Sequence, residues 1–359
     1  MIRNHLPSIL GVFAIMALSN AVVPVLPAFG EGSGLQGIIF SAYFFGALIT
    51  VFPAGIASDR IGSRILIRTG LLITVLSGII LITVDIVQII VLARIFEGIG
   101  AGLFIASAMS LLNADPDHKR LSGYFMGALN AGLLAGLAGT GWIVSIITDP
   151  RSGLAFFTII SVIAFLLSLL MVKAPSKKFL KLTTIPRYIS DYKWLWYSAI
   201  VIVGTTGAAT ALYPEFGGHD PLITGILIAS MNLTTMITVV LISHMRLEPV
   251  TTIRIGALGI GGSVVICLLS PIGFPLMGVC AGVVIIAQMA FLAETRAPQG
   301  ALMGLLNTST YGGLSLLPFM TGFIAEYTSF LFAFVTPAIF AITVALTINR
   351  CECRLPTLQ

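Results

Sequence analysis

The chain has 359 residues, of which 57% are hydrophobic and only 9% are charged, and its mean hydropathy is +1.05. Soluble domains average about a quarter charged residues, so this composition excludes an ordinary soluble protein. Its apolar runs are each close to the ~20 residues that a membrane helix needs, which excludes ~10-residue barrel strands. The sequence therefore predicts an all-α integral membrane protein.

Apolar runs between charged or Gly/Pro breaks predict twelve transmembrane helices. They cover residues 6–29, 35–57, 65–84, 88–112, 120–144, 153–172, 193–214, 221–243, 253–270, 272–293, 300–325 and 328–349. The first run could also be a signal peptide, since Arg3 precedes it and small residues lie near Asn20. We favour a membrane span, because the run continues through Pro24 and Pro27.

The basic residues predict the orientation of the chain. With the amino terminus in the cytoplasm, only Arg151 of the 19 Lys and Arg residues falls outside and only Arg94 falls within a span. The net charge of +5 therefore follows the positive-inside rule and does not indicate a nucleic-acid surface. We expect both termini in the cytoplasm and the protein in the plasma membrane.

The longest polar connection, residues 173–192, divides the chain into an amino-terminal half, 1–172, and a carboxy-terminal half, 193–359. The segments GYFMGALN from Gly123 and GALMGLLN from Gly300 share five residues, and Gly136 and Gly313 keep the same separation. This internal repeat predicts two parallel six-helix halves related by a pseudo-two-fold axis, which is typical of one class of transporter. Chance similarity between glycine-rich helices is the alternative.

The connection between the second and third runs carries a set of spaced residues. They are Gly55, Ser58, Asp59, Arg60, Gly62 and Arg64. The set resembles the signature loop of the major facilitator superfamily, GxLaDrxGrk, with Ala57 in place of Leu and Ser63 in place of a basic residue. The resemblance extends over essentially the whole chain and implies twelve helices in two halves that work by alternating access.

Three more segments resemble the drug:proton antiporter group of that superfamily. PVLP from Pro24 is similar to its first-helix proline pair, and RIFEGIGAG from Arg94 is similar to its fourth-helix motif, with Glu97 where Gln is usual. GLLAGLAGTG from Gly132 matches the fifth-helix pattern only in part, because Leu137 replaces a proline. The resemblance implies proton-coupled export.

Gly55 and Gly62 allow a tight connection, and Asp59 can cap a helix start or pair with an arginine. The resemblance implies that this loop latches the cytoplasmic ends of the halves in one conformation, a role that we assign to Asp59, Arg60 and Arg64. Alternatively, the charges only set topology, which would explain the arginines but neither Asp59 nor the glycines. The second half has no comparably intact copy, so an asymmetric latch is expected.

Arg94 and Glu97 are the ionisable residues well inside the apolar runs. A charge at that depth is costly, so it normally faces the protein interior or a wet cavity. Three residues apart on one helix, the two side chains share a face and can pair. One hypothesis is a permanent structural ion pair; the other is that Glu97 binds and releases a proton while Arg94 alternates between Glu97 and substrate.

Five amide side chains fall near the middle of predicted spans. They are Asn20, Asn130, Asn232, Gln288 and Asn307. Amides in hydrocarbon need partners, so each either bonds to another helix or lines a central cavity, and we expect at least two to line the substrate site. Aromatic side chains could also form walls of the substrate site, or they could only pack between helices. They are Tyr43, Phe44 and Tyr311.

The glycines of the fifth and eleventh runs predict close helix contacts and, with Pro318, points where the helices could bend. They are Gly132, Gly136, Gly139, Gly141, Gly312 and Gly313. No metal-ligand cluster, phosphate loop or nucleophile elbow is present, so we expect neither an enzyme nor a cofactor or metal. Cys351 and Cys353 could be acylated or bind metal, although a plain polar tail is the simpler interpretation.

These observations together predict a monomeric secondary transporter in the lipid bilayer that couples protons to efflux of a small hydrophobic or cationic compound. A symporter or facilitator that takes up a small metabolite is the main alternative. A receptor or scaffold on the same fold, without transport, is the remaining one.

Overall fold

The computed structural model describes residues 2–113, 115–171, 185–245, 247–295 and 299–350, and these residues form helices and no strand. The first group of elements is α1 (Ile2–Ala21), η1 (Val23–Phe29), α2 (Ser33–Ile61), α3 (Ser63–Thr83), α4 (Val87–Asn113), α5 (His118–Leu134), η2 (Ala135–Gly139), α6 (Thr140–Ile147) and α7 (Ser152–Ser168). The second group is α8 (Ile185–Asp191), α9 (Lys193–Gly217), α10 (Pro221–Ile242), α11 (Pro249–Ile266), α12 (Gly273–Ala293), α13 (Gln299–Tyr327), α14 (Phe330–Thr347) and η4 (Ile348–Arg350).

Among the described residues, each of the twelve predicted runs overlaps helical structure. Within the described residues, nine helices are long and apolar enough to cross a membrane, and ten if α1 and η1 form one bent span. The apolar helix α7 is shorter, at 17 residues. The chain is therefore a multi-pass membrane protein, and the full count of twelve spans stays a prediction.

Two of the predicted runs are not single regular helices. Between α1 and η1 the axis bends by 46°, where Pro24 and Pro27 follow in the chain and lack the N–H that a regular helix needs. The run predicted at 120–144 comprises α5, the π-helical turn η2 and α6. Wide turns of this kind are rare and often lie at functional positions.

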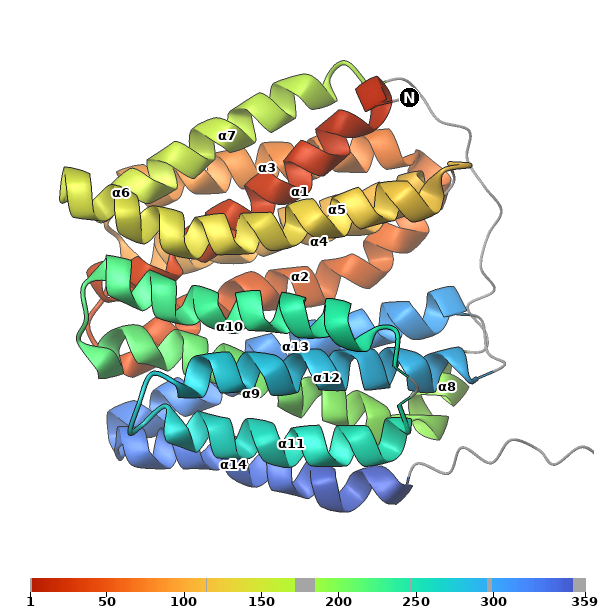
Figure 1. The fold of residues 1–359 in the computed structure, drawn as a ribbon. Helices are drawn as coiled ribbons and strands as arrows, with labels where there is room; N and C mark the ends of the chain where they lie inside the picture. Colours follow the sequence, from red (N-terminus) through yellow and green to blue (C-terminus); the bar gives the residue numbers. More distant parts are fainter. Residues whose placement is uncertain (1, 114, 172–184, 246, 296–298, 351–359) are drawn as a thin grey trace, which may run out of the picture.

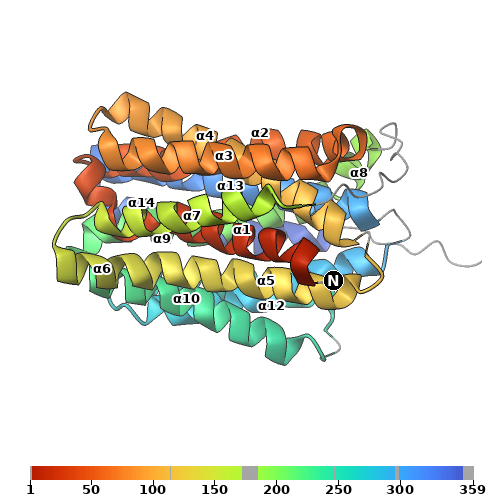
Figure 2. The ribbon, with the colours of Figure 1, turned by 90° about the horizontal axis from the view of Figure 1, so that it is seen from above.

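The helices form two bundles, α1 to α7 in one and α9 to α14 in the other, and their long axes run in a common direction (Figures 1 and 2). Between the bundles, α2 packs against α13, and α10 packs against α5, η2 and α6. Residues 173–184 of the predicted linker lie outside the described residues, and the rest of it contains α8.

The predicted close helix contacts occur at Gly136 and Gly313, whereas a Cβ at Gly312 would meet only Leu48, at 3.9 Å. A Cβ at Gly136 would lie 2.3 Å from the carbonyl oxygen of Ala17 on α1, and a Cβ at Gly313 would lie 2.1 Å from that of Ile200 on α9. No larger residue fits either place without a backbone shift. The two glycines therefore set the same kind of contact in the two bundles.

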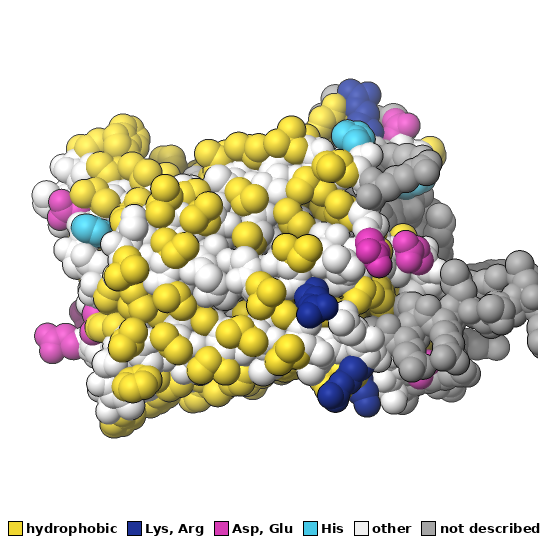
Figure 3. Space-filling model, turned by 60° about the horizontal axis from the view of Figure 1, so that its bottom comes forward, with side chains coloured by type: hydrophobic (Ala, Val, Ile, Leu, Met, Phe, Trp, Pro, Cys, Tyr) yellow, Lys and Arg dark blue, Asp and Glu magenta, His cyan; other side chains and the backbone are white. Residues whose placement is uncertain are grey.

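The two ends of the molecule differ in charge. The basic end, where α1 begins, carries Arg60, Arg64, Arg68, Lys193, Arg254 and Arg350. The acidic end, opposite, carries Glu31, Asp85, Asp149, Glu215, Asp220 and Glu326. On the face in Figure 3, apolar side chains cover the broad middle and charged side chains lie toward the ends. This pattern is typical of a membrane-embedded belt.

Candidate functional site

The strongest candidate site is the pair Arg94 and Glu97 on α4. Nη1 of Arg94 donates to Oε2 of Glu97 over 2.6 Å, and their relative exposures are 1% and 0%. The spacing of three residues puts both side chains on one helix face, as the sequence predicted. Both charges are therefore removed from solvent and depend on each other and on neighbouring polar atoms.

The guanidinium of Arg94 also joins α4 to two other helices. Its Nη2 donates to the carbonyl oxygen of Ser19 on α1 over 3.3 Å, and its Nε donates to that of Ile39 on α2 over 3.4 Å. Its carbon Cζ lies 4.8 Å from the centre of the Tyr43 ring. These backbone acceptors carry no sequence signal, which is why the sequence alone did not indicate them.

The carboxylate of Glu97 is only half satisfied. Its Oε2 accepts from Arg94, whereas its Oε1 is buried and has no hydrogen-bond partner among the described residues. A buried polar atom without a partner is costly and is often found at a functional site. Protonation would remove the charge of the carboxylate and turn one of its oxygens into a donor.

An aromatic cluster links this site to the second bundle. The Tyr43 ring meets the Phe44 ring edge-on at 4.9 Å, and the Phe44 ring stacks on that of Tyr311 from α13 at 6.4 Å. Phe40 completes the cluster, 5.1 Å from Phe44. Tyr43 is 2% exposed, and Tyr311 is half-buried. A side chain that touches Arg94 thus belongs to the same cluster as one from the other bundle.

The five predicted amides fall into different environments. Gln288 on α12 is buried and donates to the hydroxyl of Ser198 on α9 over 3.0 Å, so it makes a helix-to-helix bond. Asn20 and Asn130 each donate to a carbonyl four residues earlier on their own helix, an arrangement that neither sequence alternative included. Asn232 is half-buried, and Asn307 is exposed.

The signature segment is more helical than predicted. α2 continues up to the residue before Gly62, which alone connects it to α3 with φ +97°. Asp59 and Arg60 lie in the last turn of α2. The N-cap residue of α3 is Gly62, which makes no side-chain cap hydrogen bond. The N-cap position of α3 is therefore occupied by Gly62 and not by Asp59. The side chain of Asp59 lies outside the described residues.

Two serines close this turn. The hydroxyls of Ser58 and Ser63 are 2.8 Å apart and hydrogen-bonded. Ser63 is the position at which the sequence departs from the usual basic residue, and here it holds the end of α2 to the start of α3. Of the arginines, Arg60 is exposed and Arg64 is half-buried.

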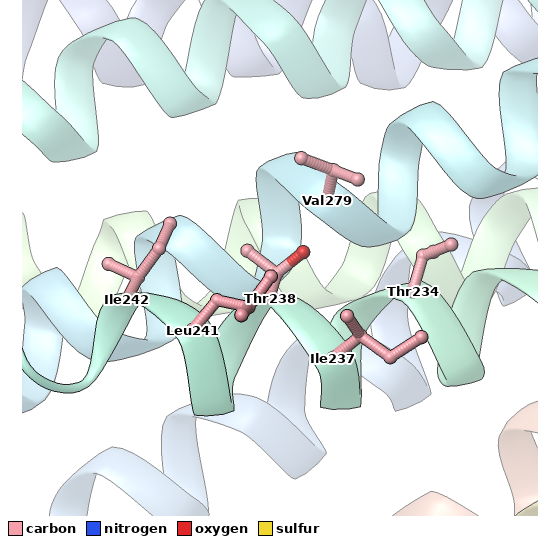
Figure 4. A pocket seen from close by; sticks show the side chains of 6 residues that line it. All are labelled: Thr234, Ile237, Thr238, Leu241, Ile242 and Val279. Atoms are coloured by element: carbon pink, nitrogen blue, oxygen red, sulfur yellow. The ribbon is translucent and has the colours of Figure 1, made fainter.

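A groove on the outer surface of the second bundle lies apart from these residues (Figure 4). It encloses about 330 Å³ between α10 and α12. Its lining comprises Thr234, Ile237, Thr238, Leu241, Ile242 and Val279. None of the predicted site residues is among them, and the exposed Leu241 and Ile237 belong to the apolar belt. The groove is therefore not the candidate site.

Comparison with known proteins places the chain in a family. The sequence profile of the Major Facilitator Superfamily matches residues 8–273. The chain is 29% identical over 145 residues to the hexuronate transporter of Bacillus subtilis (strain 168) and 29% identical over 160 residues to multidrug resistance protein 2 of the same organism. These alignments cover 40% and 42% of the chain and 34% and 39% of the relatives.

A third relative is the probable anion transporter 6, chloroplastic, of Arabidopsis thaliana, 26% identical over 124 residues, which are 33% of the chain and 24% of that protein. The chain thus spans about a quarter to two fifths of the length of these relatives. Among solved structures, that of a point mutant of the nucleoside transporter NupG aligns with a TM-score of 0.77 at 14% identity, over 97% of the chain and 99% of that chain.

The human organic anion transporter MFSD10 (TETRAN) aligns with a TM-score of 0.69 at 14% identity, over 96% of the chain and 99% of that chain. At this identity, both structures support the fold alone. The profile match extends over most of the chain, from α1 into the first residue of α12, and includes the Arg94 and Glu97 pair and the signature segment. The chain belongs to the Major Facilitator Superfamily.

Proposed function

We propose that this chain is a secondary transporter that moves a small molecule by alternating access and couples the movement to protons. The observation that carries the proposal is the buried Glu97 carboxylate, which has one oxygen on Arg94 and the other without a partner among the described residues. The family supports transport in general, and the proton site rests on this pair. The basic end would then face the cytoplasm of the cell, under the plasma membrane.

Proton binding at Glu97 has a defined structural consequence. The neutral acid holds the Arg94 guanidinium less tightly, while the carbonyl oxygens of Ser19 and Ile39 still accept from it. Arg94 also faces the Tyr43 ring, which belongs to the cluster that reaches Tyr311. A change in the pair is thus passed by direct contact to the place where the two bundles meet. Exposed Asn307 and half-buried Asn232 are candidates for the substrate site.

Export of a hydrophobic or cationic compound is the direction that we propose, on the resemblance of the Arg94 segment to the antiporter motif. Uptake of a small anionic metabolite is the second candidate, supported by the similarity to the hexuronate transporter. The two candidates differ in the sign of proton movement that accompanies substrate entry.

The deciding experiment uses purified protein in vesicles with an imposed pH gradient. Ethidium, glucuronate and uridine serve as the cationic, anionic and nucleoside probes. We expect one probe to accumulate against its gradient in the wild type. Glu97→Gln should lose that accumulation and retain exchange of the same probe without a gradient. If Glu97→Gln still responds to the pH gradient, Glu97 is not the coupling site and the pair is structural.

A further inference from the structure

A hydrogen bond joins the two bundles at the acidic end. The backbone N–H of Gly34 donates to Oε2 of Glu326 over 2.9 Å. Gly34 lies in the first turn of α2, and Glu326 lies in the last turn of α13, 292 residues later. A side chain from the second bundle therefore accepts a hydrogen bond from the first turn of a helix in the first bundle.

The start of α2 has no cap of its own. The residue before the helix is Gly32, with φ +95° and no side-chain cap bond. The first N–H groups of a helix lack partners within it, and their partial positive charge favours a nearby carboxylate. Glu326 supplies that carboxylate, in the manner of an N-cap residue that belongs to another part of the chain.

The same contact leaves no space between the helices. A Cβ on Gly34 would lie 2.1 Å from Oε2 of Glu326, and a Cβ on Gly37 would lie 2.7 Å from the carbonyl oxygen of Pro318. A Cβ on Gly322 would lie 2.7 Å from the carbonyl oxygen of Ser33. At the acidic end, α2 and α13 thus meet backbone to backbone.

Toward the basic end, glycines of the same two helices lie in more open surroundings. A Cβ on Gly312 would meet only Leu48 of α2, at 3.9 Å. Nearer that end, a Cβ on Gly55 of α2 or Gly304 of α13 would have nothing within 4 Å. Among the glycines of these two helices, close backbone contact between α2 and α13 therefore occurs at the acidic end.

We propose that Glu326 is a positioning residue that holds the acidic end closed by capping α2. When the acidic end opens, α13 moves away from α2, and the first turn of α2 loses its partner. Loss of the cap opposes opening, so Glu326 sets the balance between the two states. Its consequence for flux rests on the proposed transport function, whereas its effect on the closed state does not.

The test measures the distance between the bundles at the acidic end, without substrate or gradient. Nitroxide labels on Ile86→Cys and Leu269→Cys report it by pulsed electron spin resonance, after replacement of the four native cysteines by alanine. Both positions are exposed, in different bundles. Glu326→Ala should raise the ratio of long to short distances by about threefold to tenfold, as for loss of an N-cap of about 1 kcal/mol.

Glu31→Gln is the matched control, because it removes another exposed carboxylate at the same end, and it should leave the distances unchanged. Gly34→Ala should act like Glu326→Ala, since its methyl group would displace the carboxylate. The double variant should add nothing further. An unchanged distance distribution in both single variants would overturn the proposal. If Glu326→Ala does not fold, the label distances in Gly34→Ala and Glu326→Gln test the proposal instead. Glu326→Gln should change the distances less than Gly34→Ala.

A distance shift without any gradient-driven transport in the wild type would reject the proposed function and retain this inference. Normal pH-driven transport in the wild type, with label distances that Glu326→Ala and Gly34→Ala leave unchanged, would support the proposed function and reject this inference.

Discussion

The carboxylate of Glu97 accepts from the Arg94 guanidinium over 2.6 Å, and neither side chain is accessible to solvent. The pair binds α4 to α1 and α2 through the carbonyl oxygens of Ser19 and Ile39. Stability and coupling therefore depend on the same atoms. Variants that separate the two roles are the most informative ones.

Replacement of Arg94 by methionine should lower the free energy of unfolding by about 3 kcal/mol, since it leaves Glu97 buried without a counter-charge. The double variant Arg94→Met, Glu97→Met should recover most of this loss, because no charge remains buried. It should not recover transport driven by a pH gradient. Unfolding in detergent and transport in vesicles measure the two effects. A double variant as unstable as the single one would contradict the argument.

Arg68 and Arg151 each bond the end of a neighbouring antiparallel helix. Arg68, on α3, donates to the carbonyl oxygens of Ser168 and Leu169 at the end of α7, and Arg151, before α7, donates to that of Val84 after α3. Cations at helix carboxyl ends are stabilising.

Arg68→Ala should therefore lower the free energy of unfolding by about 1 kcal/mol. Arg254→Ala, a change of an exposed arginine at the same end, is the control for general charge effects. Equal losses of unfolding free energy in both variants would mean that the hydrogen bonds of Arg68 add no stability and that its charge only sets the membrane topology. Unfolding in detergent at constant ionic strength is the measurement.

Gln288 and Asn307 separate the two roles that the sequence left open for the amides. Gln288→Leu breaks the bond to Ser198 and should cost about 1 kcal/mol of stability. Asn307→Ala changes an exposed side chain and should change stability by less than about 0.5 kcal/mol. It should instead weaken binding of the transported probe. A large loss of stability in Asn307→Ala would place this amide in helix packing.

The loop before α5 should give the protein an acid-sensitive contact. The backbone N–H of Asp117 and the ring of His5 hold the pKa of the Asp115 carboxyl below its usual value. A lowered native pKa adds stability that is complete above the unfolded value of about 4 and is lost as the pH falls through the native pKa.

Unfolding of the wild type should therefore become easier below about pH 4, and Asp115→Asn should lack this part of the pH dependence. Asp117→Asn, in the same loop, keeps the backbone N–H that bonds Asp115 and is the control. Identical pH profiles for the wild type and Asp115→Asn would disprove the role of the contact.

Much of the site could be expected from the sequence because it consists of exceptions to an apolar pattern. Arg94 and Glu97 stand out as charges within a span, and their spacing of three predicts a shared face, which the 2.6 Å contact confirms. The acceptors of the pair could not be expected, because every residue has a carbonyl oxygen. The role of Glu326 could not be expected either, because carboxylates are common at the ends of spans and its contact with Gly34 depends on the tertiary structure.

The sequence by itself determined that the chain is helical, lies in a membrane and has its basic residues gathered on one side. These properties follow from local hydropathy and from the positions of charges along the chain, which need no knowledge of contacts. Only the tertiary structure decided which faces meet. Helices that are apolar on all sides have no periodic stripe to indicate their rotation, so the contact of Gly34 with Glu326 and that of Gln288 with Ser198 depend on packing alone.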